Sequence, residues 1–289
     1  MNRKITGSLM LLTTACIWGL AFVFQSTALE HIGNLTISCL RMFLGGLVLL
    51  PFAIFAGRKL PKGEIKDTIR SGIICGIVLC IASTTQQYGI ASTTVGKASF
   101  ISALYIVIVP LVGLLLGKSV AKRTWLAVFV AVIGFWLLCI NEDFYISRGD
   151  LLVFLSAFGY AGHILVIDHF SEGRDGVIIS CVQCLVSSAL TLLPMLLIER
   201  PTFGAIWAGR MSLFITGILS CGIAYTLQTL GQKRTPAAAA SLIMCLESVF
   251  GALFGYIILH QALSPREIAG CAFVFSAALI VNLKNLKKD

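Results

Sequence analysis

The sequence predicts an all-α polytopic membrane protein whose ten transmembrane helices form two inverted five-helix repeats around a central cavity. This fold class follows from the composition of the chain, the length of its apolar blocks and a repeat between its two halves. Of the 289 residues, 57% are hydrophobic and only 12% are charged, at a mean hydropathy of +0.93. Soluble domains carry about 25% charged residues, so this composition is typical of a membrane protein.

The apolar blocks have the length of membrane-spanning helices. An α-helix rises 1.5 Å per residue, so about 20 apolar residues cross a bilayer, and these blocks lack the alternation of membrane β-strands. The first block exceeds the core of a secretory signal and offers no convincing small-residue cleavage site, so it is interpreted as a retained span. The ten predicted spans cover residues 7–28, 34–56, 70–90, 95–117, 124–141, 149–168, 177–198, 211–231, 237–259 and 266–284.

The lysine and arginine residues predict the orientation of the chain. With the N-terminus in the cytoplasm, sixteen of the 22 Lys and Arg fall in inside segments, and four, Arg148, Arg200, Arg210 and Arg266, fall in outside segments. Cytoplasmic loops carry such an excess, so we expect a multi-pass protein of the cell's inner or plasma membrane with both termini in the cytoplasm. The net charge of +9 then reflects orientation and contact with anionic lipids. The lipid bilayer is therefore an expected partner, and nucleic acid is not.

Five residues recur almost unchanged 142 positions downstream, because ISCLR at 37–41 becomes ISCVQ at 179–183. At the same offset, Gly-Ser-Leu at 7–9 falls on Gly-Asp-Leu at 149–151, and weaker matches continue along almost the whole chain. A shared offset over this length indicates a duplication. We therefore predict one repeat of five spans in each half of the chain.

The two predicted repeats cover residues 1–145 and 146–289. Because each contains an odd number of spans, the second repeat enters the membrane upside-down relative to the first. Folds with inverted repeats place the substrate site near the bilayer midplane, between the repeats. The longest loop, residues 57–70, is short and basic, so nearly all of the protein is expected to lie in the membrane.

Metal, cofactor and enzyme chemistry are not expected. The ten cysteines lie mostly in apolar runs, and Cys181 and Cys184 have CxxC spacing without a second pair or a nearby histidine to complete a zinc site. The 13 acidic residues mostly stand alone in loops, whereas a membrane enzyme, the other class considered, needs a nucleophile and a base within reach of each other. There is no ATP-binding motif, so we expect facilitated or ion-coupled transport.

Four segments carry a family resemblance: IWG at 17–19, LRMFLGGLVLLP at 40–51, QQYGIASTTVGKASFISALYIVIVP at 86–110 and the stretch at 225–270. Through them the chain resembles the drug/metabolite transporter superfamily, in its ten-helix EamA-like branch, over essentially all 289 residues. The resemblance implies two inverted five-helix repeats around a central cavity that moves small metabolites, most often outward in bacteria. Substrates in the family range over amino acids, other metabolites and cationic drugs.

The chain departs from the family pattern in two places. Family members commonly read Leu-Glu-Pro-Val-Phe, and here Leu246 and Glu247 match while Ser248 replaces the proline. His260 and Gln261 replace the Gly-Glu that follows the next apolar run in the family. These departures leave the resemblance intact, but they argue against taking a substrate from any particular relative.

Two charged residues are predicted inside the spans, where a charge costs about 2.5–3.5 kcal/mol at the bilayer centre. Arg41 is either a binding group for a carboxylate or phosphate, or a structural pin that snorkels outward or pairs with Glu30. Glu247 is either a proton site or a partner for a cationic or amino group. Alternatively, Glu247 ties helices together through Tyr105, which occupies the equivalent position of the first repeat.

Polar residues of three other spans are further candidates. Tyr160 and His163 share one helix face, and His163 either lines the cavity or bonds a neighbouring helix. Gln87 and Gln228 are related by the repeat with a slip of one residue. They either bind the substrate from two sides of the cavity or hydrogen-bond neighbouring helices.

Aromatic and hydroxyl side chains complete the predicted site. Trp18 lies too deep in the first span for an interfacial belt, and it either forms an aromatic wall of the cavity or packs in the core. Ser99, Ser102 and Tyr105 recur every three residues along the fourth span and form a stripe expected to face the cavity. The candidate substrate-binding residues are thus Trp18, Arg41, Gln87, Ser102, Tyr105, Tyr160, His163, Gln228 and Glu247.

The sequence therefore predicts a secondary transporter of small polar metabolites, on family grounds amino acids or their relatives, acting as an exporter. The two halves are expected to rock about the central cavity and expose it to each side of the membrane in turn. The alternative is an exporter of lipophilic cations coupled to protons through Glu247, with Trp18, Tyr105 and Tyr160 attracting the cation. Protons are an expected partner in that case.

Overall fold

The computed structural model of the chain describes residues 3–117, 119–139, 147–262 and 264–286, and the regular elements in these ranges are all helical. The predicted boundary between the repeats, at residues 145 and 146, lies outside the described residues. The α-helices are α1 (Arg3–Ala28), α2 (Asn34–Gly57), α3 (Lys62–Ile90), α4 (Val95–Ser102), α5 (Tyr105–Leu115), α6 (Lys122–Cys139), α7 (Arg148–Phe170), α8 (Gly176–Pro194), α9 (Phe203–Ala208), α10 (Arg210–Phe214), α11 (Tyr225–Gln232), α12 (Ala237–Met244), α13 (Glu247–Leu259) and α14 (Pro265–Leu286), and the π-helical segments are η1 (Met195–Glu199) and η2 (Ile215–Ala224).

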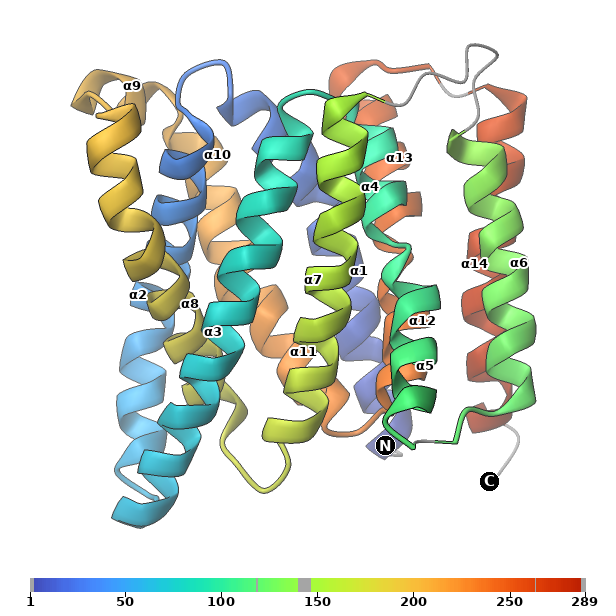
Figure 1. The fold of residues 1–289 in the computed structure, drawn as a ribbon, viewed down its shortest axis with the longest axis horizontal. Helices are drawn as coiled ribbons and strands as arrows, with labels where there is room; N and C mark the ends of the chain where they lie inside the picture. The colour runs from blue at the N-terminus through green and yellow to red at the C-terminus, as the bar shows by residue number, and fades with distance from the viewer. Residues whose placement is uncertain (1–2, 118, 140–146, 263, 287–289) are drawn as a thin grey trace.

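The long helices stand side by side as one bundle (Figure 1). α1 begins and α14 ends at one edge of this bundle, which we call the lower edge (Figure 1). α7 begins at the opposite edge, which we call the upper edge (Figure 1). α1 and α7 therefore run in opposite directions through the bundle.

Eight helical stretches of the described chain are long and apolar enough to cross a membrane, by length and composition. They coincide with eight of the ten predicted spans. The other two predicted spans, 124–141 and 266–284, correspond to α6 and α14, which pack against each other. The prediction of an all-helical polytopic membrane protein is confirmed, whereas the count of ten spans and the inverted repeat stay predictions.

Large apolar side chains cover the outer faces of the helices. Phe52, Leu115 and Phe203, for example, expose 63%, 86% and 78% of their surface. Apolar surface of this extent promotes association in water, while the hydrocarbon of a bilayer solvates it. Helices also satisfy their backbone hydrogen bonds internally, which is a condition for crossing that hydrocarbon.

The packing of the helices follows the offset of 142 residues. α2 packs along α8, and α6 along α14, so each of these helices meets its own counterpart. α3 packs along α7, and the counterpart contact of α1 with η2 and α11 is also present. Likewise, α1 packs along α13 while α7 packs along α4 and α5. The contacts of one half thus recur, with the partners exchanged, in the other half.

The starts of α2 and α8 are capped in different ways. α8 is capped by Asp175, whose carboxylate accepts two backbone N–H groups of the first turn. α2 has Gly33 at this position, and its cap is provided by Glu199 at the end of η1. The Glu199 carboxylate accepts the N–H groups of Leu35 and Thr36 at 2.8 Å each and the Thr36 hydroxyl at 2.7 Å. A negative group at a helix start also interacts favourably with the positive end of the helix dipole. Glu199 therefore fixes the start of α2 to the end of η1.

Candidate functional site

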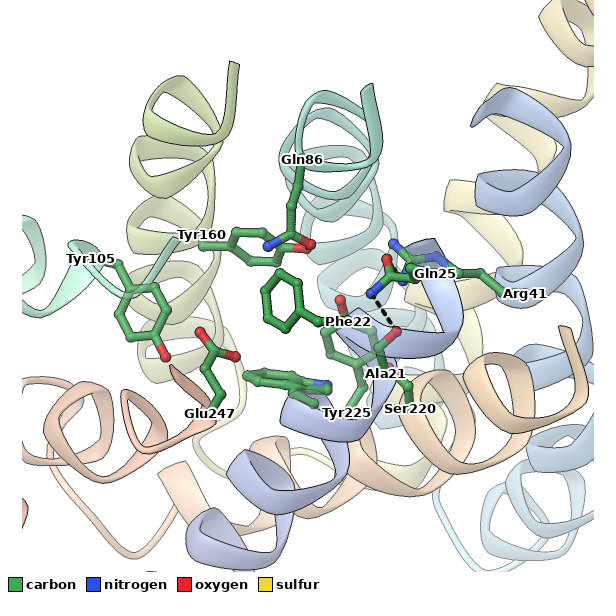
Figure 2. A pocket seen from close by; sticks show the side chains of 11 residues that line it. Ala21, Phe22, Gln25, Arg41, Gln86, Tyr105, Tyr160, Ser220, Tyr225 and Glu247 are labelled. Atoms are coloured by element: carbon green, nitrogen blue, oxygen red, sulfur yellow. Dashed lines mark hydrogen bonds between the residues drawn. The ribbon is translucent and has the colours of Figure 1, made fainter. Parts of the chain in front are cut away.

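A pocket lies between helices that come from both halves of the chain (Figure 2). α1 contributes four side chains, and seven further elements contribute one each. The pocket is lined by Trp18, Ala21, Phe22, Gln25, Arg41, Gln86, Tyr105, Tyr160, Ser220, Tyr225 and Glu247. The space open to the centre of a water-sized molecule is about 20 Å³, enough for about one water molecule. The pocket must therefore widen before it can accept a metabolite.

Two interrupted helices position Tyr105 and Glu247. One span is broken between α4 and α5, and its counterpart is broken between α12 and α13, so that Tyr105 and Glu247 are each the first residue after a break. At the breaks the backbone turns more tightly, with bonds from Leu104 N to Ile101 O at 3.2 Å and from Ser248 N to Cys245 O at 3.1 Å. The Tyr105 hydroxyl and the Glu247 carboxyl point toward one another on the same side of the pocket (Figure 2). Discontinuous helices are a common source of binding groups in transporters.

The break before α13 is stabilised by a side chain in place of a proline. The Cys245 carbonyl oxygen accepts from Ser248 Oγ at 2.7 Å as well as from the Ser248 backbone N–H at 3.1 Å, so the hydroxyl reinforces the tight turn. Close packing of α13 on α1 then fixes Glu247 beside Trp18. A Cβ atom on Gly19 would lie 2.4 Å from Cβ of Phe250 and 2.7 Å from the backbone nitrogen of Gly251, so only glycine fits at this crossing.

Arg41 provides a buried positive charge with free donors. Its side chain is 2% exposed, and Nη1 donates to Oε1 of Gln25. Nε and Nη2 have no hydrogen-bond partner among the residues that the structure describes. An arginine fork binds carboxylates through paired N–H groups, and a buried charge without a partner is strongly unfavourable. The guanidinium is therefore suited to an anionic group of a ligand.

A chain of hydrogen bonds holds Gln86 and Tyr160 in the wall of the pocket. The Tyr160 hydroxyl donates to Gln86 Oε1 at 2.9 Å, and Gln86 Nε2 donates to Ser102 Oγ at 2.8 Å. Ser102 is fully buried and does not line the pocket itself. Its role is to orient the Gln86 amide.

Aromatic rings line the pocket between Arg41 and Glu247. The Trp18 and Tyr225 rings meet edge to face at 5.2 Å between centroids. Phe22 and Tyr160 also line the pocket, and Figure 2 shows these rings between Glu247 on one side and Arg41 on the other. Within the described ranges, neither Arg41 nor Glu247 forms an ion pair. The pocket thus presents a positive end and an acidic end, separated by aromatic surface.

Of the predicted residues, Trp18, Arg41, Tyr105, Tyr160 and Glu247 line the pocket together, and the other four do not. Ser102 lies behind Gln86, as described above. His163 Nε2 is 3.0 Å from Gln183 Oε1, and the His163 ring packs edge to face on Tyr225, which separates it from the pocket.

The remaining two candidates are the repeat-related glutamines. Gln87 is fully buried, and neither amide atom has a partner among the described residues. It follows Gln86 directly, and successive residues on a helix point about 100° apart. Gln86 therefore faces the pocket, and Gln87 points away from it. Gln228 is 1% exposed and also lies outside the lining.

Sequence reasoning missed several lining residues for which a signal exists. Ala21, Phe22 and Gln25 follow Trp18 at i+3, i+4 and i+7, so they share its helix face. Ser220 and Tyr225 had no comparable signal, because the π-helical turns of η2 change which side chains face inward.

The fold and the pocket are those of a membrane transporter. The chain belongs to the EamA-like transporter family, because the family model matches residues 5–140 and again residues 147–283. The resemblance noted in the sequence is thereby confirmed.

Several relatives of similar length are described as transporters. The chain is 28% identical to an "Uncharacterized transporter" of Archaeoglobus fulgidus, over 98% of this chain and 87% of the relative. It is 26% identical to "Uncharacterized transporter YwfM" of Bacillus subtilis, over 95% and 93%, and 24% identical to "Protein RarD" of Streptomyces exfoliatus, over 99% and 91%. A solved crystal structure shares the fold at a TM-score of 0.74 and 17% identity, over 99% of this chain and all of that chain.

Proposed function

We propose that the protein is a secondary transporter that exports small zwitterionic metabolites, amino acids or their relatives, by alternating access. The observation that carries this proposal is the placement of Arg41 and Glu247 at opposite sides of one pocket, with aromatic rings between them (Figure 2). A free carboxylate and a free ammonium group on one small molecule match this pattern.

The two ends of the pocket are suited to the two ends of an amino acid. The carboxylate accepts from Nε and Nη2 of Arg41, which have no other partner in the described chain, and such charge-assisted bonds are roughly twice as strong as neutral ones. The ammonium group binds Glu247, beside the Tyr105 hydroxyl. Arg41 then receives an anionic partner for donors that have none among the described residues, and Glu247 receives a cationic one.

The alternative, a transporter of lipophilic cations, fits the pocket less well. Aromatic rings and Glu247 attract a cation, but Arg41 carries a positive charge in the same low-dielectric space, where like charges repel strongly. A zwitterion can bind Arg41 through its carboxylate and Glu247 through its ammonium group.

Two inverted repeats, residues 1–145 and 146–289, are part of the proposal. The family model matches the chain twice, the helix breaks before Tyr105 and Glu247 are 142 residues apart, and the helix contacts recur with exchanged partners. Such a fold opens a central site to one side of the membrane and then to the other. The narrow pocket corresponds to a closed step of this cycle.

The excess of Lys and Arg at the lower edge supports a cytoplasmic location for both termini, in the cell's inner or plasma membrane. In that orientation the upper edge faces outward. The lipid bilayer is then the main partner, and neither a metal nor a cofactor takes part.

The test compares three ligands of equal side chain by thermal unfolding of the purified protein. A ligand that binds only the folded state raises the unfolding temperature. We expect an amino acid to raise it, and the matching amine without carboxylate and the matching acid without amino group to raise it less. Stabilisation by the amine as large as by the amino acid would instead favour the cation transporter.

Flux into proteoliposomes tests the role of Glu247. We expect Glu247→Gln to lose amino-acid flux while inserting and folding normally, because the amide cannot neutralise an ammonium group. An imposed pH gradient in the same assay examines coupling to protons. Flux that ignores the gradient would contradict proton coupling and favour a uniporter.

A further inference from the structure

A charged network fixes the start of α7 at the upper edge of the bundle. Asp150, in the first turn of α7, is 6% exposed. Its carboxylate accepts the hydroxyl of Thr93 and the backbone N–H of Ser147, the latter at 2.9 Å. Lys97, in the first turn of α4, places Nζ 3.6 Å from Oδ2 of the same carboxylate. We call Thr93, Lys97 and Asp150 the upper lock.

The backbones behind the upper lock are in close contact. A Cβ atom on Gly149 would lie 2.6 Å from the carbonyl oxygen of Ser92 and 2.7 Å from that of Gly89. The Ser147 hydroxyl also donates to the Ser92 carbonyl oxygen at 3.2 Å. The end of α3, the start of α4 and the start of α7 are therefore held together at one point.

An apolar plug separates the upper lock from the pocket. Its side chains are at most 2% exposed and come from α1, α3, α4 and α7. Phe22 both lines the pocket and belongs to the plug. The upper plug consists of Phe22, Val23, Ile90, Val95, Ala98 and Val153. A route from the pocket to the upper edge is thus closed by an apolar layer and by a charged layer.

The lower edge repeats the close approach with different groups, and there the charged Arg234 donates from Nη1 to the thioether sulfur of Met10 in α1 at 3.1 Å. Subtracting or adding 142 relates Asp150 to Ser8 and Lys97 to Ala239, so neither position carries a charge. A Cβ atom on Gly7 would lie 2.7 Å from Thr235 Oγ1 and 3.2 Å from the backbone oxygen of Gly231. The close approach of α1 to the loop before α12 therefore repeats that of α7 to the loop before α4, but no ion pair reinforces it among the residues described.

The counterpart of the upper plug is also weaker. Val95 corresponds to Ala237, and Ile90 corresponds to Gln232. Gln232 Nε2 donates to the Ile164 backbone oxygen at 2.9 Å, while its buried Oε1 has no partner in the described part of the chain. A smaller side chain buries less apolar area, and an unpartnered buried acceptor is destabilising. Both differences make the lower closure easier to open.

We infer that the upper lock holds the upper mouth of the pathway closed in the substrate-free protein, so that the empty pocket opens first toward the lower edge. The inference rests on the alternating access of the proposed function, and it specifies toward which edge the empty pocket opens. In the proposed orientation the lower edge faces the cytoplasm. The empty transporter therefore collects its substrate from the cytoplasm, and opening outward requires the Lys97–Asp150 pair to separate.

The test uses two single-cysteine reporters at equivalent positions. Ala98→Cys lies in the upper plug and Ala240→Cys in its counterpart, and both alanines are fully buried. The full chain is placed in lipid nanodiscs, where both edges meet solvent, and labelling by a polar maleimide is followed by mass spectrometry. The chain without an added cysteine gives the background from the native cysteines.

Lys97→Met removes the ion pair and keeps the Ser147–Asp150 cap of α7. We expect labelling of the Ala98→Cys reporter to become about fivefold faster, as for the loss of one partly exposed pair, and labelling of the Ala240→Cys reporter to become slower. Removing the Lys97 charge by itself would slow labelling of the nearby Ala98→Cys thiol, because a neighbouring cation favours the reactive thiolate. Faster labelling in Lys97→Met would therefore report opening of the upper plug. Lys97→Arg, which keeps the charge, should leave both rates near the parent values.

Ala239→Ser, at the position equivalent to Lys97, is the matched control at the lower edge and should leave both rates unchanged, because it adds no charge and removes no contact of a polar group. Equal labelling of Ala98→Cys with and without Lys97→Met would overturn the inference, and so would an equal increase at both reporters, which indicates general loosening. Labelling needs no substrate, so it is independent of the proposed substrate class. If the reporters respond in opposite directions but amino acids are not transported, the upper lock stands and the substrate proposal fails.

Discussion

The two halves of the chain place different chemistry at equivalent positions. Arg41 on α2 lines the pocket, and two of its nitrogen donors have no partner among the described residues. Gln183, 142 residues later on α8, instead contacts His163 behind Tyr225. Tyr105 and Glu247 are also equivalent, and both line the pocket, but only one is acidic. A pocket built from two identical halves would carry the same groups on both sides. Here the first half supplies the cation and the second half the carboxyl, so a bound zwitterion has one preferred direction.

Arg41→Gln gives α2 the residue that α8 has, and it is expected to have the largest effect. Hydrogen bonds to charged groups contribute about 1.5–3 kcal/mol, so amino-acid affinity measured by calorimetry should fall roughly 10- to 100-fold. Affinity for the matching amine should not fall. The unfolding temperature should also not fall, because the substitution removes a buried charge without a counter-ion.

Gln183→Ala is the control for that substitution at the equivalent position. It removes a contact of His163 outside the pocket, so amino-acid affinity should change by less than about threefold, the range of indirect effects on a distant site. Equal losses in both variants would show that Arg41 acts through the fold rather than on the substrate.

Gly19→Ala examines a second difference between the halves. The equivalent residue is Ala161, which is buried without difficulty on α7, while a Cβ atom on Gly19 would lie within 2.8 Å of backbone and side-chain atoms of α13. Overpacking typically costs about 1–3 kcal/mol, so the unfolding temperature and the flux should both fall. Gly113→Ala, in α5, meets nothing within 4 Å and should be neutral or slightly stabilising. Unchanged stability of Gly19→Ala would mean that α1 and α13 are not packed as described.

Gln87→Leu is expected to have the smallest effect. Both amide atoms of Gln87 are buried without a partner in the described chain, so an apolar side chain of similar size should leave stability unchanged or raise it. Flux should stay within about twofold of the parent, the range of substitutions away from special features. A large loss of flux would contradict this expectation and place Gln87 on the substrate route.

Much of the fold follows from the sequence because hydropathy and length are local properties. Spans two and three, predicted at 34–56 and 70–90, correspond to α2 and to the upper part of α3. The site was harder to predict, because the periodicity of a helix tells which residues share a face and not how deep each lies. Tyr160 and His163 illustrate this limit: they share a face of α7, but Tyr225 from another span covers His163.

Neighbouring residues and unusual turns set the remaining limits. Gln86 and Gln87 are chemically identical, and the choice between them depends on the rotation of α3, which packing against α7 and α8 decides. Tyr225 faces the pocket after the π-helical turns of η2, whose period differs from 3.6 residues. The helix break before Glu247 could not be located from a proline, because the sequence has Ser248 at that position, and its hydroxyl bonds the Cys245 carbonyl oxygen in the turn.

The cap that Glu199 provides for α2 bears on how the protein moves. Glu199 ends a helix of the second half, and its three hydrogen bonds hold the first turn of a helix of the first half. α2 and α8 also pack along each other over their length. A motion that separated the two halves as whole bodies would break this joint, so α2 and α8 are expected to travel together. We therefore expect the moving bodies of the transporter to differ from the two predicted repeats, with Arg41 of the first repeat moving together with α8 of the second.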